Sequence, residues 1–443
     1  GLHRSETTPI SYRGRPTSQC DYFVKQQSLS RLGLFFFGGL ALTTIFGLVQ
    51  IFGQKIGLVS QLGVIAGLNT VGSLLSWAIY SAFGLVVIIA VLFWGKMADL
   101  ACKKNKILLI GLGLLIIFEL IILNYSVVWL ALALVIIFLM AYKFFTFNKL
   151  DPILVIIISF FLFFGFAGKS FPALVDLPIE VRPSLSATFE VIKGGLTFPR
   201  FLIGSGPSTF SYDYSLHRPL ALNQTNLWQL RFNQGFSFLP TFLATAGILA
   251  VLAILFLVFC LIWQIRQALS GTSLQTRQAG PIALGIIFLL ISWLFAPNFF
   301  TQSLFIFFGL GLITALANSV KEISLADFSK FRVFIFFVVL IIFITGIFAG
   351  IFMAGKKYIG LVYYDKALRS SQAGDFDSAL MNLDKAGRMD PGQDQYFRDF
   401  SQLLLLRVDA LARQATDDLS AEGLRLEIQN TAAAAIQTAS QAA

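Results

Sequence analysis

Charged residues are scarce in this chain: 13% of its 443 residues are Asp, Glu, Lys or Arg, while 56% are hydrophobic. Ordinary soluble domains carry roughly 25% charged residues, so this composition excludes that class of protein. We therefore expect an all-α, polytopic membrane protein. The net charge of +10 does not indicate a nucleic-acid partner, because basic residues in membrane proteins mark the loops left on the cytoplasmic side.

Cysteine and histidine are also rare. The three cysteines, Cys20, Cys102 and Cys260, are too scattered to form a disulfide framework or a metal site. The two histidines are His3 and His217. With so few ligands of these types, the sequence predicts no metal site and no bound cofactor.

Long apolar runs predict about nine membrane spans. The first, from Leu32 to Gly53, has no charged residue and is long enough to cross a hydrocarbon core of about 30 Å at 1.5 Å per residue. The other expected spans are 71–95, 107–123, 126–142, 153–168, 237–263, 281–297, 301–319 and 332–354.

The distribution of basic residues predicts the orientation. Residues 1–31 are polar and basic and lack the apolar core of a secretory signal, so we expect them to be a cytoplasmic segment. The cluster Lys103-Lys104-Asn105-Lys106 is the clearest cytoplasmic anchor. With an odd number of spans in the membrane domain, 32–354, the long polar loop 167–236 and the tail 355–443 both face outward.

The tail has the spacing of a tetratricopeptide unit, a hairpin of two helices whose small residues allow close packing. A second unit begins near Gln395 and fades toward Ala435, so we expect a soluble extracytoplasmic helical domain that is incomplete. Such hairpins bind proteins or act as spacers, and both readings stay open. The matching residues are Tyr364, Ala367, Gly374-Asp375-Phe376, Ala379, Leu383, Ala386 and Pro391.

The loop 167–236 is the place to look for chemistry. Leu185 to Ile192 has the apolar spacing of a short surface helix. Gly204-Ser205-Gly206-Pro207 predicts a tight turn whose glycines let the backbone approach a ligand closely. We interpret this turn as a corner that aims a following strand of polar residues across a cavity mouth.

This order of features resembles the O-antigen ligase and polymerase superfamily, which are bacterial membrane glycosyltransferases. The resemblance rests on the helix 185–192, on Ile203-Gly204-Ser205-Gly206-Pro207-Ser208-Thr209-Phe210, and on the span that begins near Thr245-Ala246-Gly247. Asn69, in Gly67-Leu68-Asn69-Thr70, matches the Asn-rich start of an earlier span. The resemblance covers roughly 60–320.

The resemblance implies a location and a reaction. The protein would lie in the cytoplasmic (inner) membrane and move a glycan from a polyprenyl diphosphate carrier to a glycan, lipid or protein acceptor on the outer face. Two features depart from the family. Phe236 and Ser237 stand where a His-Asn pair is usual, and only one span precedes the Asn-rich element.

Such a transferase must hold two phosphates and orient an acceptor hydroxyl. Arginine suits the phosphates, and of Arg182, Arg200, Arg218 and Arg231 we favour Arg218 and Arg231 as catalytic residues. His217 is the candidate general base, with Asp213, Glu190 and Asp176 as alternatives. The expected substrate-binding residues are Arg200, Gly204, Gly206, Asn223, Asn226 and Asn69.

Other readings remain. Tyr212, Tyr214 and Trp228 would stack on sugars or anchor the loop at the interface. Glu119, inside a span, should face protein or water, with its role undecided. No Asp-x-Asp pair occurs in the loop, so we expect metal-independent use of a lipid-linked sugar. The alternatives are a non-catalytic membrane scaffold that presents its repeats to cell-envelope partners and, third, a transporter.

Overall fold

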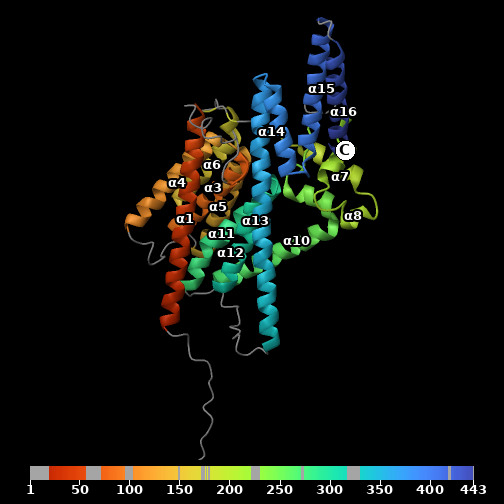
Figure 1. Ribbon diagram of the computed structural model, residues 1–443. Helices are drawn as coiled ribbons and strands as arrows, with labels where there is room; N and C mark the ends of the chain where they lie inside the picture. The colour runs from red at the N-terminus through yellow and green to blue at the C-terminus, as the bar shows by residue number, and fades with distance from the viewer. Residues whose placement is uncertain are drawn as a thin grey trace, which may run out of the picture. The chain divides into compact units, whose positions relative to one another are not determined.

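The computed structural model describes residues 19–55, 71–94, 103–147, 150–170, 175, 177, 180–220, 230–270, 274–316, 330–417 and 421–442. Within these residues the chain is all-helical and contains no β-strand, as the composition and the apolar runs predict (Figure 1). The helices form two compact units, α1 to α12 and α13 to α16.

The first unit contains the apolar helices that correspond to the predicted spans up to residue 319. Each predicted apolar run lies largely within one helix, although α1 begins 13 residues before the predicted span and other ends shift by up to seven residues. The helices are α1 (Gln19–Lys55), α3 (Leu74–Trp94), α4 (Lys103–Leu123), α5 (Ser126–Phe147), α6 (Pro152–Ala167), α10 (Phe238–Ser270), α11 (Leu274–Phe295) and α12 (Phe300–Leu316). Short helices lie between α6 and α10: η1 (Gly168–Ser170), α7 (Leu185–Gly195), α8 (Arg200–Ile203) and α9 (Phe210–His217).

Six helices among the described residues are long and apolar enough to cross a membrane. Three further apolar helices are shorter, at Pro152–Ala167, Ala279–Phe295 and Phe300–Ala315. The chain is therefore a membrane protein by the length and composition of its helices, and the count of about nine spans stays a prediction. The six longer helices lie at Arg31–Gly53, Leu74–Phe93, Asn105–Leu123, Ser126–Phe145, Phe238–Arg266 and Val333–Gln372.

Helix α11 organises the packing of the first unit, because it contacts α3, α5, α10 and α12. Small residues let helices approach one another: a methyl group placed on Gly47 of α1 would overlap the Trp77 ring of α3. A methyl group on Gly84 of α3 would likewise overlap the side chain of Leu40 of α1. Glycine at these positions thus brings α1 close to α3.

The second unit begins with α13 (Lys330–Gln372), continues with α14 (Phe376–Met389) and α15 (Asp394–Asp417), and ends with α16 (Ala421–Ala442). Helices α13 and α14 form the expected hairpin, with Gly374 at positive φ in the turn and Asp375 capping α14. Ala367, Ala379 and Leu383 are buried where the helices meet. The hairpin agrees with the spacing of small residues, while membership of the tetratricopeptide family stays a prediction.

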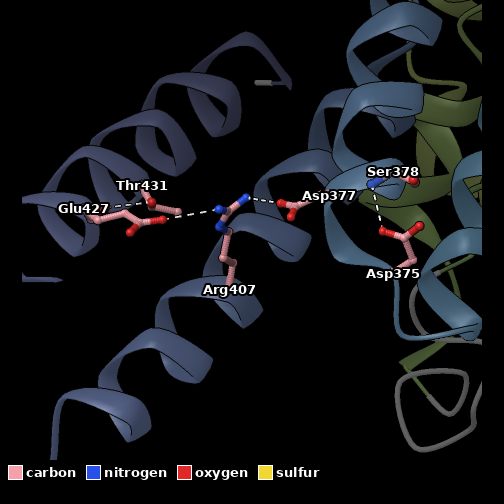
Figure 2. Close-up of polar contacts among 6 residues, drawn as sticks. All are labelled: Asp375, Asp377, Ser378, Arg407, Glu427 and Thr431. Carbon is pink, nitrogen blue, oxygen red and sulfur yellow. Dashed lines mark hydrogen bonds and ion pairs between the residues drawn. The ribbon is translucent and has the colours of Figure 1, made fainter. Parts of the chain in front are cut away.

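Polar contacts join α14, α15 and α16, as Figure 2 shows. Arg407 of α15 donates to Asp377 of α14 at 2.5 Å and to Glu427 of α16 at 3.2 Å. These groups are partly exposed, and exposed ion pairs contribute about 0–1 kcal/mol each. Buried contacts such as Ser401 Oγ donating to the Ala435 carbonyl at 3.0 Å add to the packing of α15 on α16.

The predicted domain boundary at 354/355 falls within α13, which is one continuous helix. Side chains from Phe334 to Ile359 are exposed, so the apolar part of α13 has the all-round apolar surface of a helix in lipid. No proline separates this part from the polar part that packs on α14, and the helix continues through Gly355 and Gly360. Helix α13 therefore continues past the end of the apolar run, where its surface changes from apolar to polar.

Candidate functional site

One end of the first unit gathers the polar contacts, and we call it the loop end. The Glu180 carboxylate accepts hydrogen bonds from the backbone N–H groups of Leu74 at 2.6 Å and Leu75 at 3.3 Å. It therefore caps the N-terminus of α3, where free N–H groups and the helix dipole favour an anion. The segment before α7 is thereby fixed to the start of α3.

Other helix ends meet at the same place. The Asn124 side chain, between α4 and α5, donates to the Gly168 carbonyl at the end of α6 at 2.8 Å. The Phe238 N–H, at the start of α10, donates to the Ala296 carbonyl just after α11 at 3.0 Å. The loop between α6 and α10 therefore covers this end of the helical unit.

Arg182 lies at the loop end with Glu180 and Tyr125. Its Nη1 is buried and has no hydrogen-bond partner among the described residues. Burial lowers the pKa of the Arg182 guanidinium, while Glu180 and Tyr125 act in the opposite direction. Burial also raises the pKa of Tyr125, an effect that the Glu180 carboxylate reinforces. The result is a half-buried cation whose Nη1 group has N–H donors for an acceptor.

Phe236 stands where the family resemblance implies a histidine. Its ring centroid lies 6.0 Å from the Arg182 guanidinium carbon, within the range of a cation–π contact. Its backbone N–H donates to Thr188 Oγ1 of α7 at 2.9 Å, and Thr188 is fully buried. The phenylalanine therefore packs against the arginine, and no imidazole is available here for proton transfer.

An apolar groove begins beside this position, between α5, α10 and α11. It encloses about 800 Å³ and has Leu239 and Trp293 at the loop end and Tyr142 and Arg266 at the other end. Phe238 links it to Phe236, because the Phe238 ring lies 4.6 Å from the Trp293 ring. A charged site and a lipid-sized apolar groove are thus joined through four consecutive residues, 236–239.

The glycine turn after α8 packs against a kink in α10. Gly204 and Gly247 both have φ of +75°, and a methyl group on either would overlap backbone atoms of the other segment. The N–H groups of Ser205 and Gly206 donate to the carbonyls of Ala244 and Thr245 at 3.2 and 2.8 Å. In a regular helix these carbonyls would accept from residues four positions on. The close approach that Gly204 permits is therefore to α10.

The residues after the turn form helix α9, and the expected polar strand is wrong. Phe210 and Tyr214 are spaced four apart, so on a helix they share one face, and both are buried with Val191 of α7 and Ala244 of α10. This small core fixes α9 against α7 and α10. Figure 1 shows α7 and α8 beside the first part of α10.

Asp213 of α9 is 2% exposed and accepts a hydrogen bond from Ser205 Oγ. The Ser205 and Thr209 hydroxyl oxygens lie 2.6 Å apart, and Thr209 donates to the Gly206 carbonyl at 2.7 Å. Asp213 Oδ1 has no partner among the described residues. Ser205, Thr209 and Asp213 form a partly buried polar cluster that ties the turn to α9.

His217 follows Asp213 by one helical turn. A methyl group on Gly194, near the end of α7, would lie 2.5 Å from His217 Nδ1, and one on Gly195 would lie 4.0 Å from Asp213 Cγ. His217 is therefore at the C-terminal end of α7, whereas Arg182 is before its N-terminus. An 11-residue helix is about 16 Å long, so these two side chains belong to separate places.

The structure places the favoured arginines near α9. Burial raises the pKa of Tyr214, and the charge of Arg218, which caps the end of α9, acts in the opposite direction. Arg231 is exposed and precedes Phe232, whose ring lies 5.2 Å from the Tyr214 ring. Arg200 is exposed at the start of α8. The roles predicted for these arginines stay predictions.

Five further candidate residues lie outside the described residues, so their roles stay predictions. They are Asn69, Asp176, Asn223, Asn226 and Trp228.

Sequence reasoning included Arg182 among four arginines but did not single it out. The available signal was the sequence Glu180-Val181-Arg182-Pro183, which sets opposite charges two residues apart just before a helix. Both residues are half-buried, and the neighbours of Arg182 include Tyr125 and Phe236, which are far away in the chain.

Across the described ranges, no group of three or more His, Cys, Asp or Glu side chains is arranged to hold a metal ion. The site is thus a set of polar side chains at the loop end, joined to an apolar groove. Comparisons with protein-family models, with curated proteins and with solved structures find no match to this chain.

Proposed function

We propose that this chain is a membrane glycosyltransferase of the O-antigen ligase or polymerase type. It transfers or polymerises a glycan from a polyprenyl diphosphate carrier onto a glycan, lipid or protein acceptor. The observation that carries the proposal is the connection between the half-buried Arg182, whose Nη1 has no partner among the described residues, and the apolar groove that begins at Leu239 and Trp293.

A polyprenyl diphosphate has the matching two-part chemistry. Its diphosphate needs positive charge and N–H donors, which Arg182 supplies as a planar fork. Its hydrocarbon chain needs an apolar surface open to lipid, and the groove lining of Leu, Ile, Val and Phe side chains suits that chain. A free sugar nucleotide would have no use for such a groove.

The reaction breaks the bond between the first sugar and the diphosphate and forms a bond from that sugar to an acceptor hydroxyl. The polyprenyl diphosphate leaves with its negative charge, which Arg182 stabilises. The acceptor hydroxyl gives its proton to water, which carries it into the solvent. His217 and Asp213 of α9 lie near the C-terminal end of α7 and are too far from Arg182 to act at the same point. In this proposal they, with Arg218 and Arg231, contact the glycan.

The orientation belongs to the same proposal. The loop end faces the outside of a bacterial cytoplasmic membrane, and the chain crosses about nine times. The basic cluster that starts α4 at Lys103 supports this arrangement, because the other end of α4, Leu123, is at the loop end. Basic residues at the end opposite the loop fit a cytoplasmic face.

The test is transfer by the purified full chain in lipid nanodiscs. Arg182→Met removes the charge and keeps much of the side-chain volume, so release of polyprenyl diphosphate should fall by about two orders of magnitude or more. Arg182→Lys keeps the charge but loses the fork, and its rate should lie between those of the unmutated chain and Arg182→Met. Lys193→Met, which removes an exposed charge from α7, is the matched control.

Unchanged transfer in Arg182→Met would remove Arg182 from the site. The scaffold alternative is favoured by Phe236, which stands where the resemblance expects a catalytic histidine. Under that alternative no variant releases polyprenyl diphosphate, while partner capture depends on helices α14 to α16.

A further inference from the structure

A second polar cluster lies inside the helical unit, away from Arg182. Glu119 of α4 is within an apolar span and is 0% exposed. Thr44 of α1 and Ser81 of α3 are also 0% exposed, and their hydroxyl groups face the Glu119 carboxyl. A carboxylate in such a place is unfavourable unless a positive charge neutralises it.

Among the described residues no charged side chain acts on Glu119, whose polar neighbours are Ser81 and Thr44. Both carboxyl oxygens and both hydroxyl oxygens are buried without a hydrogen-bond partner in the described part of the chain. Four oxygens from three helices therefore gather around the Glu119 carboxyl, where a cation would neutralise the carboxylate.

The ligands define the class of ion. Hard cations bind oxygen, and a single carboxylate balances the charge of one monovalent cation but leaves a divalent cation with excess charge in an apolar surrounding. The close burial of all three side chains favours a small ion. We propose that Glu119, Thr44 and Ser81 bind one sodium ion, which holds α1, α3 and α4 together.

This site is separate from the proposed transferase site. Ser81 lies seven residues along α3 from Leu74, which Glu180 caps, and that corresponds to about 10 Å of helix. The sodium proposal therefore does not depend on the proposed glycan transfer, and each has its own measurement.

The first measurement is the thermal unfolding temperature of the full chain in sodium, potassium or choline chloride at one ionic strength. Sodium should raise this temperature in a saturable manner, because an ion that binds the folded state stabilises it by mass action. An unfolding temperature that is equal in all three salts would overturn the proposal.

Variants locate the effect. Glu119→Gln keeps the shape but removes the charge and should abolish the sodium effect, while Thr44→Val and Ser81→Ala should weaken apparent sodium affinity about tenfold or more. Thr43→Val is the matched control, because the Thr43 hydroxyl bonds to the carbonyls of Gly39 and Leu40. A sodium effect that persists in Glu119→Gln would contradict the assignment.

A labelling experiment on the unmutated protein avoids dependence on the folding of variants. Dicyclohexylcarbodiimide reacts with protonated carboxyl groups in apolar surroundings, and mass spectrometry locates the adduct. Sodium should slow the labelling of Glu119 relative to potassium at the same pH. Labelling at equal rates in both salts would mean that Glu119 binds a proton only, and the sodium site would be rejected.

Discussion

At the scale of single residues, the loop end is held by polar contacts between segments far apart in the chain. Thr188 is an example: its Oγ1 donates to the Ser184 carbonyl at 3.0 Å and accepts from the Phe236 N–H at 2.9 Å. One hydroxyl thus fixes Phe236, and with it the ring that packs on Arg182, to the first turn of α7.

We expect Thr188→Val to release this segment. Valine fills nearly the same volume but leaves the Phe236 N–H without its acceptor, at a cost of about 1–3 kcal/mol. Hydrogen–deuterium exchange of the Phe236 amide should become faster by about tenfold or more. Thr188→Ser keeps the oxygen and is the matched control. Equal exchange in the valine and serine variants would show that the hydroxyl does not hold Phe236.

The residue scale also shows where sequence reasoning reached its limit. The tight turn at Gly204 was predictable, because glycine at positive φ is a local property. The segment that packs against Gly204 was not predictable, because it is the backbone of Thr245, 41 residues further along the chain. The burial of Arg182 has the same cause, as its surroundings come from distant segments.

At the scale of elements, the apolar pattern of the sequence predicted where the helices lie but not which helices pack against one another. The surface helix expected at 185–192 is α7, with its N-cap Ser184 bonded to the Ala187 N–H. The prediction of a strand after the turn is wrong, because this segment is helix α9. Phe210 and Tyr214 have helical spacing, but the polar residues between them hide that pattern in the sequence. Packing of this helical face against α7 stabilises α9 as a helix.

The contact between α1 and α3 gives a test at this scale. In Gly47→Ala the new methyl group would overlap the Trp77 ring, and overpacking of this kind costs about 1–3 kcal/mol. We expect a lower thermal unfolding temperature in detergent. Gly38→Ala on the same helix is the control, because a methyl group there would meet no atom within 4 Å and alanine favours helix. Equal unfolding temperatures would contradict this packing of α1 on α3.

At the scale of the whole molecule, the first unit joins two chemically different surfaces. A polar loop covers one end of a set of apolar helices, and a lipid-sized groove runs from that end between α5, α10 and α11. Composition alone predicted the membrane class. The connection of charge to groove through residues 236–239 arises only when α10 and α11 meet, as in the bond from Phe238 to Ala296.

The central claim is that the chain transfers a glycan from a lipid carrier. Its most direct measurement is the release of polyprenyl diphosphate from a lipid-linked glycan by the purified full chain in nanodiscs, with chelator present and with glycan, lipid and protein acceptors supplied in turn. The account predicts release that requires one of these acceptors and persists in chelator. Absence of release above the protein-free background with every acceptor would contradict it.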